Sequence, residues 1–94
     1  MNKEEILDFL KRNRTLFEQE YNVEKIGLFG SYVNGCQTDK SDIDILVSMP
    51  SSFDKYYSLK EFLESNLKAK VDLGLEKNLR ELIKKRIRDE IIYV

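Results

Sequence analysis

The sequence predicts an α+β fold in which a small mixed sheet of three strands or more is packed on one face by helices. Three short segments, residues 23–29, 41–47 and 71–75, have the apolar composition and length of strands. Three longer segments carry apolar residues at intervals of three or four, which is typical of amphipathic helices. The order helix, strand, turn, strand, helix, strand, helix predicts helices layered against a sheet.

Length and composition predict one compact domain over residues 1–94. Apolar residues make up 41% of the chain and charged residues 35%, with a single proline, which is typical of a folded protein rather than a disordered one. The 16 basic residues are balanced by 17 acidic ones, so no basic surface for direct nucleic-acid binding is expected.

Several classes of protein and of chemistry are disfavoured by what the sequence lacks. Cys36 is the only cysteine and cannot form an internal disulfide, the first residues are charged, and no apolar stretch is long enough to span a membrane. These features predict a cytoplasmic protein without membrane contact. The absence of histidine excludes histidine general bases and histidine metal ligands, which leaves carboxylates, hydroxyls and cations as the reactive groups.

The first helix and the first strand are predicted from the N-terminal third. Asn2 is followed three residues later by Glu5, which is a capping-box pattern, and helical spacing continues to about Glu20. The segment Val23 to Phe29 has the composition of a strand, and Gly30 with Ser31 ends it.

The second strand, Ser41 to Val47, has two chemically different faces. Alternation places Ile43, Ile45 and Val47 on one face. Asp42, Asp44 and Leu46 fall on the other face. An ionised carboxylate is costly to bury without a partner, so this second face must be open or must hold a cation.

The remaining elements follow the same patterns. Pro50 and the serines after it predict the start of a helix, and the third strand, Val71 to Leu75, places Asp72 opposite its apolar residues. A last helix is predicted from about Asn78. The apolar stripes of the two helices, together with the neighbouring Tyr57, are expected in the core: Phe53, Tyr56, Leu59, Leu63 and Leu67, then Leu79, Leu82, Ile83, Ile87 and Ile91.

Three carboxylates are candidate metal ligands. If the second and third strands are neighbours, Asp42, Asp44 and Asp72 converge, and their repulsion would raise their pKa values unless a divalent cation neutralised them. Oxygen ligands on an open face suit Mg²⁺ or Mn²⁺. Gly30 and Ser31 would add a turn that lets the backbone approach a phosphate, so the combination predicts phosphoryl or nucleotidyl transfer.

A simpler interpretation exists for each part taken alone. The two aspartates could be a solvated strand face, and Gly30-Ser31 or Asn34-Gly35 could be ordinary turns. The functional interpretation depends on the glycine–serine turn, the two aspartates of the second strand and the aspartate of the third strand occurring together, because one site can use all of them.

The motifs "LFGSYVNG", "SDIDILV" and "KVDLGLE" together resemble the minimal nucleotidyltransferase domains of the polymerase-beta-type superfamily, over essentially the whole chain. The resemblance implies a polymerase-beta-like fold in which Gly30 and Ser31 hold the phosphates of a nucleotide. It also implies that Asp42 and Asp44 bind two Mg²⁺ ions, and that Asp72 shares the catalytic metal and orients the attacking hydroxyl. Asn34 stands where many relatives carry an arginine.

Relatives of this size are commonly antitoxins whose partner is a helical HEPN-domain ribonuclease toxin. The resemblance therefore implies transfer of AMP from ATP to a tyrosine of such a toxin. Two alternatives stay open: an antitoxin that neutralises its partner by binding alone, and a small-molecule nucleotidyltransferase. The second usually needs another domain to form the acceptor pocket.

Overall fold

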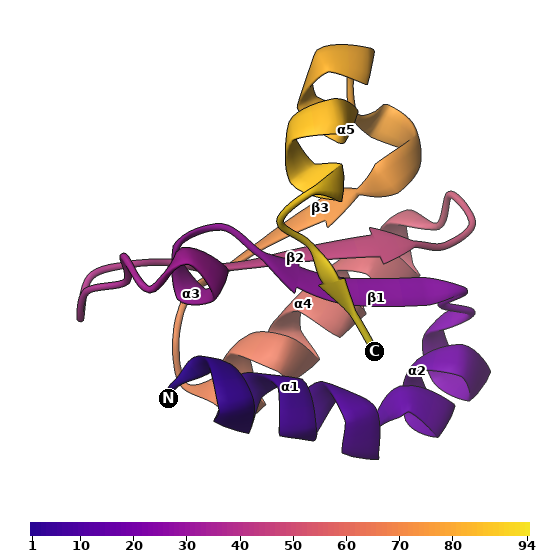
Figure 1. The fold of residues 1–94 in the computed structure, drawn as a ribbon. Helices are drawn as coiled ribbons and strands as arrows, with labels where there is room; N and C mark the ends of the chain where they lie inside the picture. The colour runs from indigo at the N-terminus through magenta and orange to yellow at the C-terminus, as the bar shows by residue number, and fades with distance from the viewer.

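A mixed four-stranded sheet organises the chain, which a computed structural model describes over residues 1–94. The strands β1 (Lys25–Phe29), β2 (Ile43–Ser48), β3 (Val71–Leu75) and β4 (Ile92–Tyr93) lie in the order β3-β2-β1-β4 (Figure 1). β2 pairs parallel with β3, and β1 pairs antiparallel with both β2 and β4. The predicted α+β class is confirmed, and the sheet has one strand more than the three identified from the sequence.

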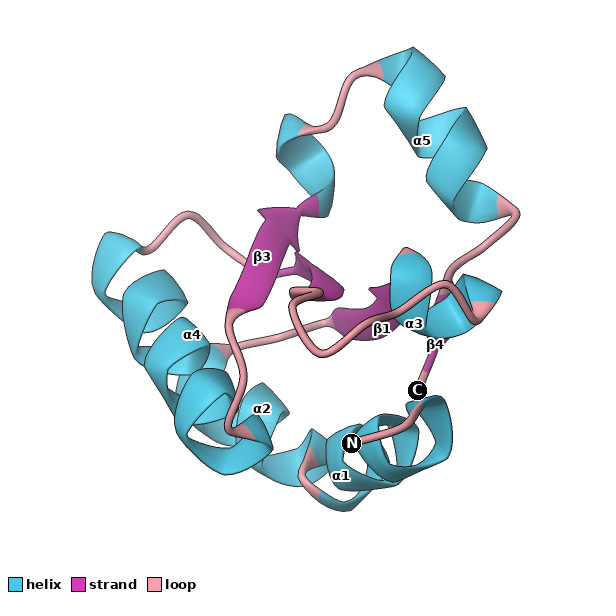
Figure 2. Ribbon diagram, turned by 90° about the vertical axis from the view of Figure 1, so that its left-hand side faces the viewer, coloured by secondary structure: helices cyan, strands magenta, loops and turns pink.

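Three helices cover one face of the sheet. They are α1 (Lys3–Arg12), α2 (Arg14–Tyr21) and α4 (Phe53–Leu67), which Figures 1 and 2 show together on the same side. The core lies between this layer and the sheet. Helices α1, α2 and α4 and strands β1 and β2 all contribute side chains with almost no exposed surface: Ile6, Leu10, Phe17, Leu28, Ile45, Val47, Leu59 and Leu63. None of the helices is both long enough and apolar enough to cross a lipid bilayer.

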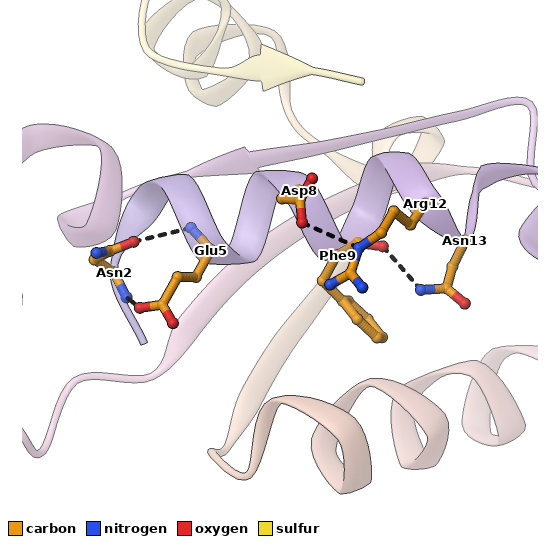
Figure 3. A network of polar contacts seen from close by, with 6 residues as sticks. All are labelled: Asn2, Glu5, Asp8, Phe9, Arg12 and Asn13. Carbon is orange, nitrogen blue, oxygen red and sulfur yellow. Dashed lines mark hydrogen bonds and ion pairs between the residues drawn. The ribbon is translucent and has the colours of Figure 1, made fainter.

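The N-terminal helix begins as predicted but ends earlier. Asn2 accepts a hydrogen bond from the Glu5 amide at 2.9 Å and Glu5 accepts one from the Asn2 amide at 3.1 Å, which completes the capping box (Figure 3). The prediction of a single helix to about Glu20 is wrong. Asn13 ends α1, because its side chain donates to the carbonyl of Phe9 at 2.9 Å, and a second helix, α2, follows.

The second predicted helix, α4, is confirmed, but part of its expected core is not. Ser52 caps it by accepting a hydrogen bond from the Lys55 amide, and Leu59, Leu63 and Leu67 are buried. Phe53 is 78% exposed and Tyr57 is 48% exposed, so the prediction that they belong to the core is wrong. Both lie at the start of α4, where their rings contact each other with centroids 4.6 Å apart instead of packing into the core.

The C-terminal segment departs most from the prediction. A short 3-10 helix, η1 (Glu76–Asn78), leads to α5 (Glu81–Arg88), and the chain then returns as β4 beside β1. Figure 1 shows α5 on the opposite side of the sheet from the other long helices, so packing of all helices on one face is wrong. The predicted core residue Leu82 is 80% exposed and Ile83 is 42% exposed.

Candidate active site

The strand register brings two of the predicted carboxylates together. Asp44 of β2 lies directly opposite Asp72 of β3 in the parallel pairing, so both side chains point to the same face of the sheet. The intervening residues Ile43 and Ile45 are buried on the helical face. The predicted division of β2 into an apolar face and a carboxylate face is therefore confirmed, and Asp42 lies one residue ahead of the first residue of β2.

The environment of Asp44 disfavours its charged form. Partial burial is the largest cause, followed by the negative charges of Asp72 and Asp42 and a side-chain hydrogen bond with Asp72, and together they raise the pKa of Asp44 from 3.8 to about 6. A buried carboxylate beside other carboxylates has this behaviour because ionisation adds charge where little solvent screens it. Any cation placed here would relieve that repulsion.

The donor set fits a hard divalent cation, although the site is not fully assembled. The nearby ligand atoms are carboxylate oxygens, which Mg²⁺ prefers. No three acidic or cysteine side chains are already arranged to hold one metal ion. The expected convergence of three carboxylates is thus only partly formed: Asp44 and Asp72 face each other in register, whereas Asp42 lies in the segment that precedes the strand.

Gly30 lies directly against Asp44. It follows β1, caps the short helix α3 (Ser31–Asn34), and has a φ of +80°, a conformation that side chains disfavour. A Cβ atom at this position would overlap with Oδ2 of Asp44 and lie 2.9 Å from its Cγ. The glycine therefore allows the backbone turn and the carboxylate to occupy adjacent space, and Ser31 begins α3 beside it, as the sequence predicts.

The carboxylate face is bounded by residues that sequence reasoning did not identify. Two residues along β2 from Asp44, on the same face of the sheet, Leu46 pairs with Gly27 of β1 and with Gly74 of β3. Leu46 is only 2% exposed. A Cβ on Gly27 would lie 2.9 Å from Cγ1 of Ile91, so the glycine admits the segment that connects α5 to β4. A glycine inside a strand often marks a place where another part of the chain approaches the backbone closely. Gly27 could therefore have indicated from the sequence that another segment covers this face of the sheet.

Asp44→Asn is expected to stabilise the fold in a pH-dependent way. Because the pKa of Asp44 is higher in the folded state than its ordinary value, the folded protein loses stability as the pH rises from 3.8 to about 6, and the full loss remains at higher pH. The neutral amide avoids this loss, so the variant should melt a few degrees higher than the wild type at pH 7.5. The difference should shrink as the pH falls through about 6 and be absent below 3.8, where the carboxyl is protonated in both states. Thermal melts in chelator across this range test it.

The control for this experiment is Asp39→Asn, which removes an exposed carboxylate from the segment ahead of β2. It changes the net charge equally and should not reproduce the gain. A melting temperature for Asp44→Asn that is below the wild type at pH 7.5, or a gain that persists unchanged at acid pH, would contradict the electrostatic account of the site.

Comparison of the sequence with known proteins identifies a family for this chain. The nucleotidyltransferase domain family profile matches residues 4–94. The chain is 38% identical over 93 residues to the protein adenylyltransferase MntA of Thermococcus cleftensis, covering 97% of this chain and 94% of that protein. It is 41% identical over 95 aligned positions to a candidate protein adenylyltransferase of Methanocaldococcus jannaschii, covering 96% and 95% of the two chains.

Solved structures extend the similarity. A candidate minimal nucleotidyltransferase superposes with a TM-score of 0.84 at 24% identity, covering 98% of this chain and 95% of that one, which supports the fold. A chain of a toxin–antitoxin complex with AMP-PNP superposes with a TM-score of 0.70 at 26% identity, covering 99% of this chain and 72% of that one. With its Asp44–Asp72 face and a family match over nearly its whole length, this chain belongs to the nucleotidyltransferase domain family.

Proposed function

We propose that this protein transfers AMP from ATP to a tyrosine of a HEPN-type ribonuclease toxin and so acts as its antitoxin in the cytoplasm. The observation that carries the proposal is the carboxylate pair Asp44 and Asp72, held in register with Gly30 packed against it. Relatives covered along almost their whole length are named as protein adenylyltransferases. One solved structure that contains a chain similar to this one is the complex of a tri-AMPylated Shewanella oneidensis HEPN toxin with an MNT antitoxin.

In this proposal the turn after β1 holds the nucleotide. Gly30 brings the backbone close to Asp44 with no side chain between them, and the Ser31 hydroxyl lies at the start of α3, where backbone amides favour anions. Asn34, one residue before Gly35, is neutral, so it supplies no positive charge to the triphosphate. Charge neutralisation of the triphosphate then depends more heavily on cations at the carboxylates.

Asp42, Asp44 and Asp72 would hold Mg²⁺, with two ions as the expected number. When bound, the ions would neutralise the triphosphate and stabilise the oxygens that attack and leave the α-phosphorus. Binding would require the three carboxylates to approach one another further, because no three acidic side chains are arranged to hold one ion. The raised pKa of Asp44 supports this role, since a cation would favour its ionised form.

The proposed reaction is an in-line displacement. The hydroxyl oxygen of the acceptor tyrosine forms a bond to the α-phosphorus of ATP, and the bond from that phosphorus to the bridging oxygen of the β-phosphate breaks. AMP stays on the tyrosine, pyrophosphate leaves, and Asp72 orients the hydroxyl and takes its proton. Because a carboxylate can orient the nucleophile and accept its proton, the reaction is compatible with a chain that has no histidine.

The direct test is intact mass spectrometry of a HEPN-domain protein encoded beside this gene, with and without co-expression of this chain. The expected result is an increase in mass by whole steps of one AMP, lost when the tyrosines of the partner are replaced with phenylalanine. An unmodified partner that nevertheless binds this chain would contradict the enzymatic proposal and favour neutralisation by binding.

Gly30→Ala is expected to reduce AMP transfer more than Gly35→Ala, because the two glycines differ in both backbone conformation and surroundings. Gly30 has φ +80° and ψ −150°, a region essentially restricted to glycine, whereas Gly35 has φ +77° and ψ +14°, the left-handed region, where an alanine costs about 1–2 kcal/mol. A Cβ on Gly30 would overlap with Asp44, whereas a Cβ on Gly35 has no neighbour within 4 Å. Only the first substitution should therefore displace the carboxylate.

Melting temperatures and transfer rates of the two variants separate the effects. Both should lose some stability, and Gly30→Ala should lose additional stability and most of its transfer rate. Equal transfer rates in the two variants at a temperature where both are folded would show that Gly30 is only a turn residue.

A further inference from the structure

A groove lies at the outer edge of the sheet, beside the strand that carries Asp72. β3 is an edge strand, paired with β2 on one side only (Figure 2). The groove has a volume of about 610 Å³ and lies between the start of α4 and the end of β3. The residues that form it and enter the argument are Phe53, Tyr56, Tyr57, Leu73, Leu75 and Lys77.

The groove exposes more aromatic surface than a folded chain normally leaves to solvent. Phe53 is 78% exposed and Tyr57 is 48% exposed. Tyr57 contacts Phe53 at 4.6 Å and Tyr56 at 5.1 Å between ring centroids, so the three rings form one continuous surface. Contiguous exposed apolar surface of this kind marks interaction sites, and aromatic side chains supply much of the binding energy of protein interfaces.

The edge of β3 is partly blocked to an added strand. Alternate residues of a parallel strand direct their amide and carbonyl groups to each side, and on the outer side the Val71 amide donates to Glu64 at 3.0 Å. The Leu73 carbonyl accepts a hydrogen bond from the Tyr56 hydroxyl. Two of the positions that an incoming strand would use are therefore occupied, which favours a partner that docks through its side chains, as a helix does.

The groove borders the edge strand that carries Asp72, and its residues Leu73 and Leu75 lie on the opposite face of that strand from the carboxylate. Asp44 has Gly30 packed against it and β1 on its far side, and the segment from α5 to β4 covers the next row of the sheet at Gly27. Asp72, on the outer strand, is exposed. Burial raises the pKa of Tyr56, with further contributions from Tyr57 and from the charge of Asp72, so the groove lies within electrostatic reach of that carboxylate.

We propose that this aromatic groove is the docking surface for the acceptor-bearing partner, and that its occupant is a partner helix with apolar side chains for the three rings. The inference rests on the proposed function, because it places the partner along the edge strand that carries Asp72. Lys77 sets the charge of the helix, since it is the only charged residue that lines the groove. The helix therefore carries carboxylates beside its apolar residues.

The test is the double variant Phe53→Ser/Tyr57→Ser, whose side chains are exposed and outside the core. At saturating ATP, the KM for the HEPN-domain partner is expected to rise at least about tenfold, the effect of losing one aromatic anchor. The kcat at saturating partner and the Kd for ATP with Mg²⁺ should stay near the wild-type values, because neither residue contacts the carboxylate site. An unchanged KM for the partner would overturn the proposal.

The matched control is Leu82→Ser, which removes an equally exposed apolar side chain from α5 and should leave the KM unchanged. A higher KM for Leu82→Ser, with none for the double variant, would move the docking surface to α5 and overturn the proposal. If the wild-type protein transfers no AMP, the proposed function fails, and titration calorimetry with the same partner still tests the groove. Loss of binding in the double variant supports it, and wild-type binding refutes it.

Discussion

Asp44→Asn is expected to slow AMP transfer by about a hundredfold or more, because it removes a charged ligand of the ions that would stabilise the reacting oxygens. Asp44 is central to the site, because Asp72 lies opposite it, the charge of Asp42 acts on it, and Gly30 packs against it. The amide keeps the shape of the side chain and removes its charge. Both the KM for ATP and kcat should therefore worsen, since the same group places the triphosphate and supports its reaction.

Two comparisons identify the cause of that loss. The substitution is expected to raise the melting temperature at pH 7.5, so a folded and more stable protein would have lost its activity. Glu61→Gln removes an exposed carboxylate from α4 and should leave transfer unchanged. Asp42→Asn should resemble Asp44→Asn in damaging both nucleotide binding and turnover. Wild-type transfer by Asp44→Asn would remove the carboxylate face from the mechanism.

The carboxylate face could be predicted from sequence because its signal is local. A strand alternates its side chains between two faces, so Ile43, Asp44 and Ile45 define the faces without any knowledge of the fold. The same reasoning places Asp72 opposite the buried Val71 and Leu73. That β2 and β3 are neighbours is a tertiary fact, which the sequence supports only through the helical crossover between them.

The break between α1 and α2 could not be predicted in the same way. Ile6, Leu10 and Phe17 are all fully buried, so the apolar periodicity continues across the point where the helix ends. The interruption depends on Asn13, whose side chain returns to the carbonyl of Phe9. An asparagine favours such side-chain contacts with the backbone, but the sequence does not say whether it will interrupt a helix or point to solvent.

The C-terminal segment shows a second limit. The stripe of Leu79, Leu82, Ile83 and Ile87 predicts a buried helix face, yet Leu82 and Ile83 of α5 are exposed. The pattern measures amphipathicity, and it does not indicate which surface covers the helix. The strand β4 has only two residues, too few for any alternation to be recognised, and it exists because Ile91 and Ile92 can approach Gly27.

Asp72→Asn is expected to leave ATP binding largely intact while slowing AMP transfer by about a hundredfold or more, the scale on which an acid–base group contributes. Asp72 lies on the outer strand, is exposed, and stands on the side from which an acceptor hydroxyl can approach. Its charge is therefore needed for orienting and deprotonating the acceptor more than for placing the triphosphate. This pattern differs from Asp44→Asn, for which both the KM for ATP and kcat change.

Measuring transfer at saturating and limiting ATP, alongside growth of cells that co-express the toxin with each variant, separates the two roles and tests the enzymatic proposal itself. Asp72→Asn should lose kcat with an unchanged KM for ATP, and cells that depend on it should grow poorly. Transfer at the wild-type rate would show that the third aspartate is not catalytic. If the asparagine variants of Asp42, Asp44 and Asp72 all rescue growth without transferring AMP, the domain neutralises its partner by occupying it, and the carboxylates are not required for that role.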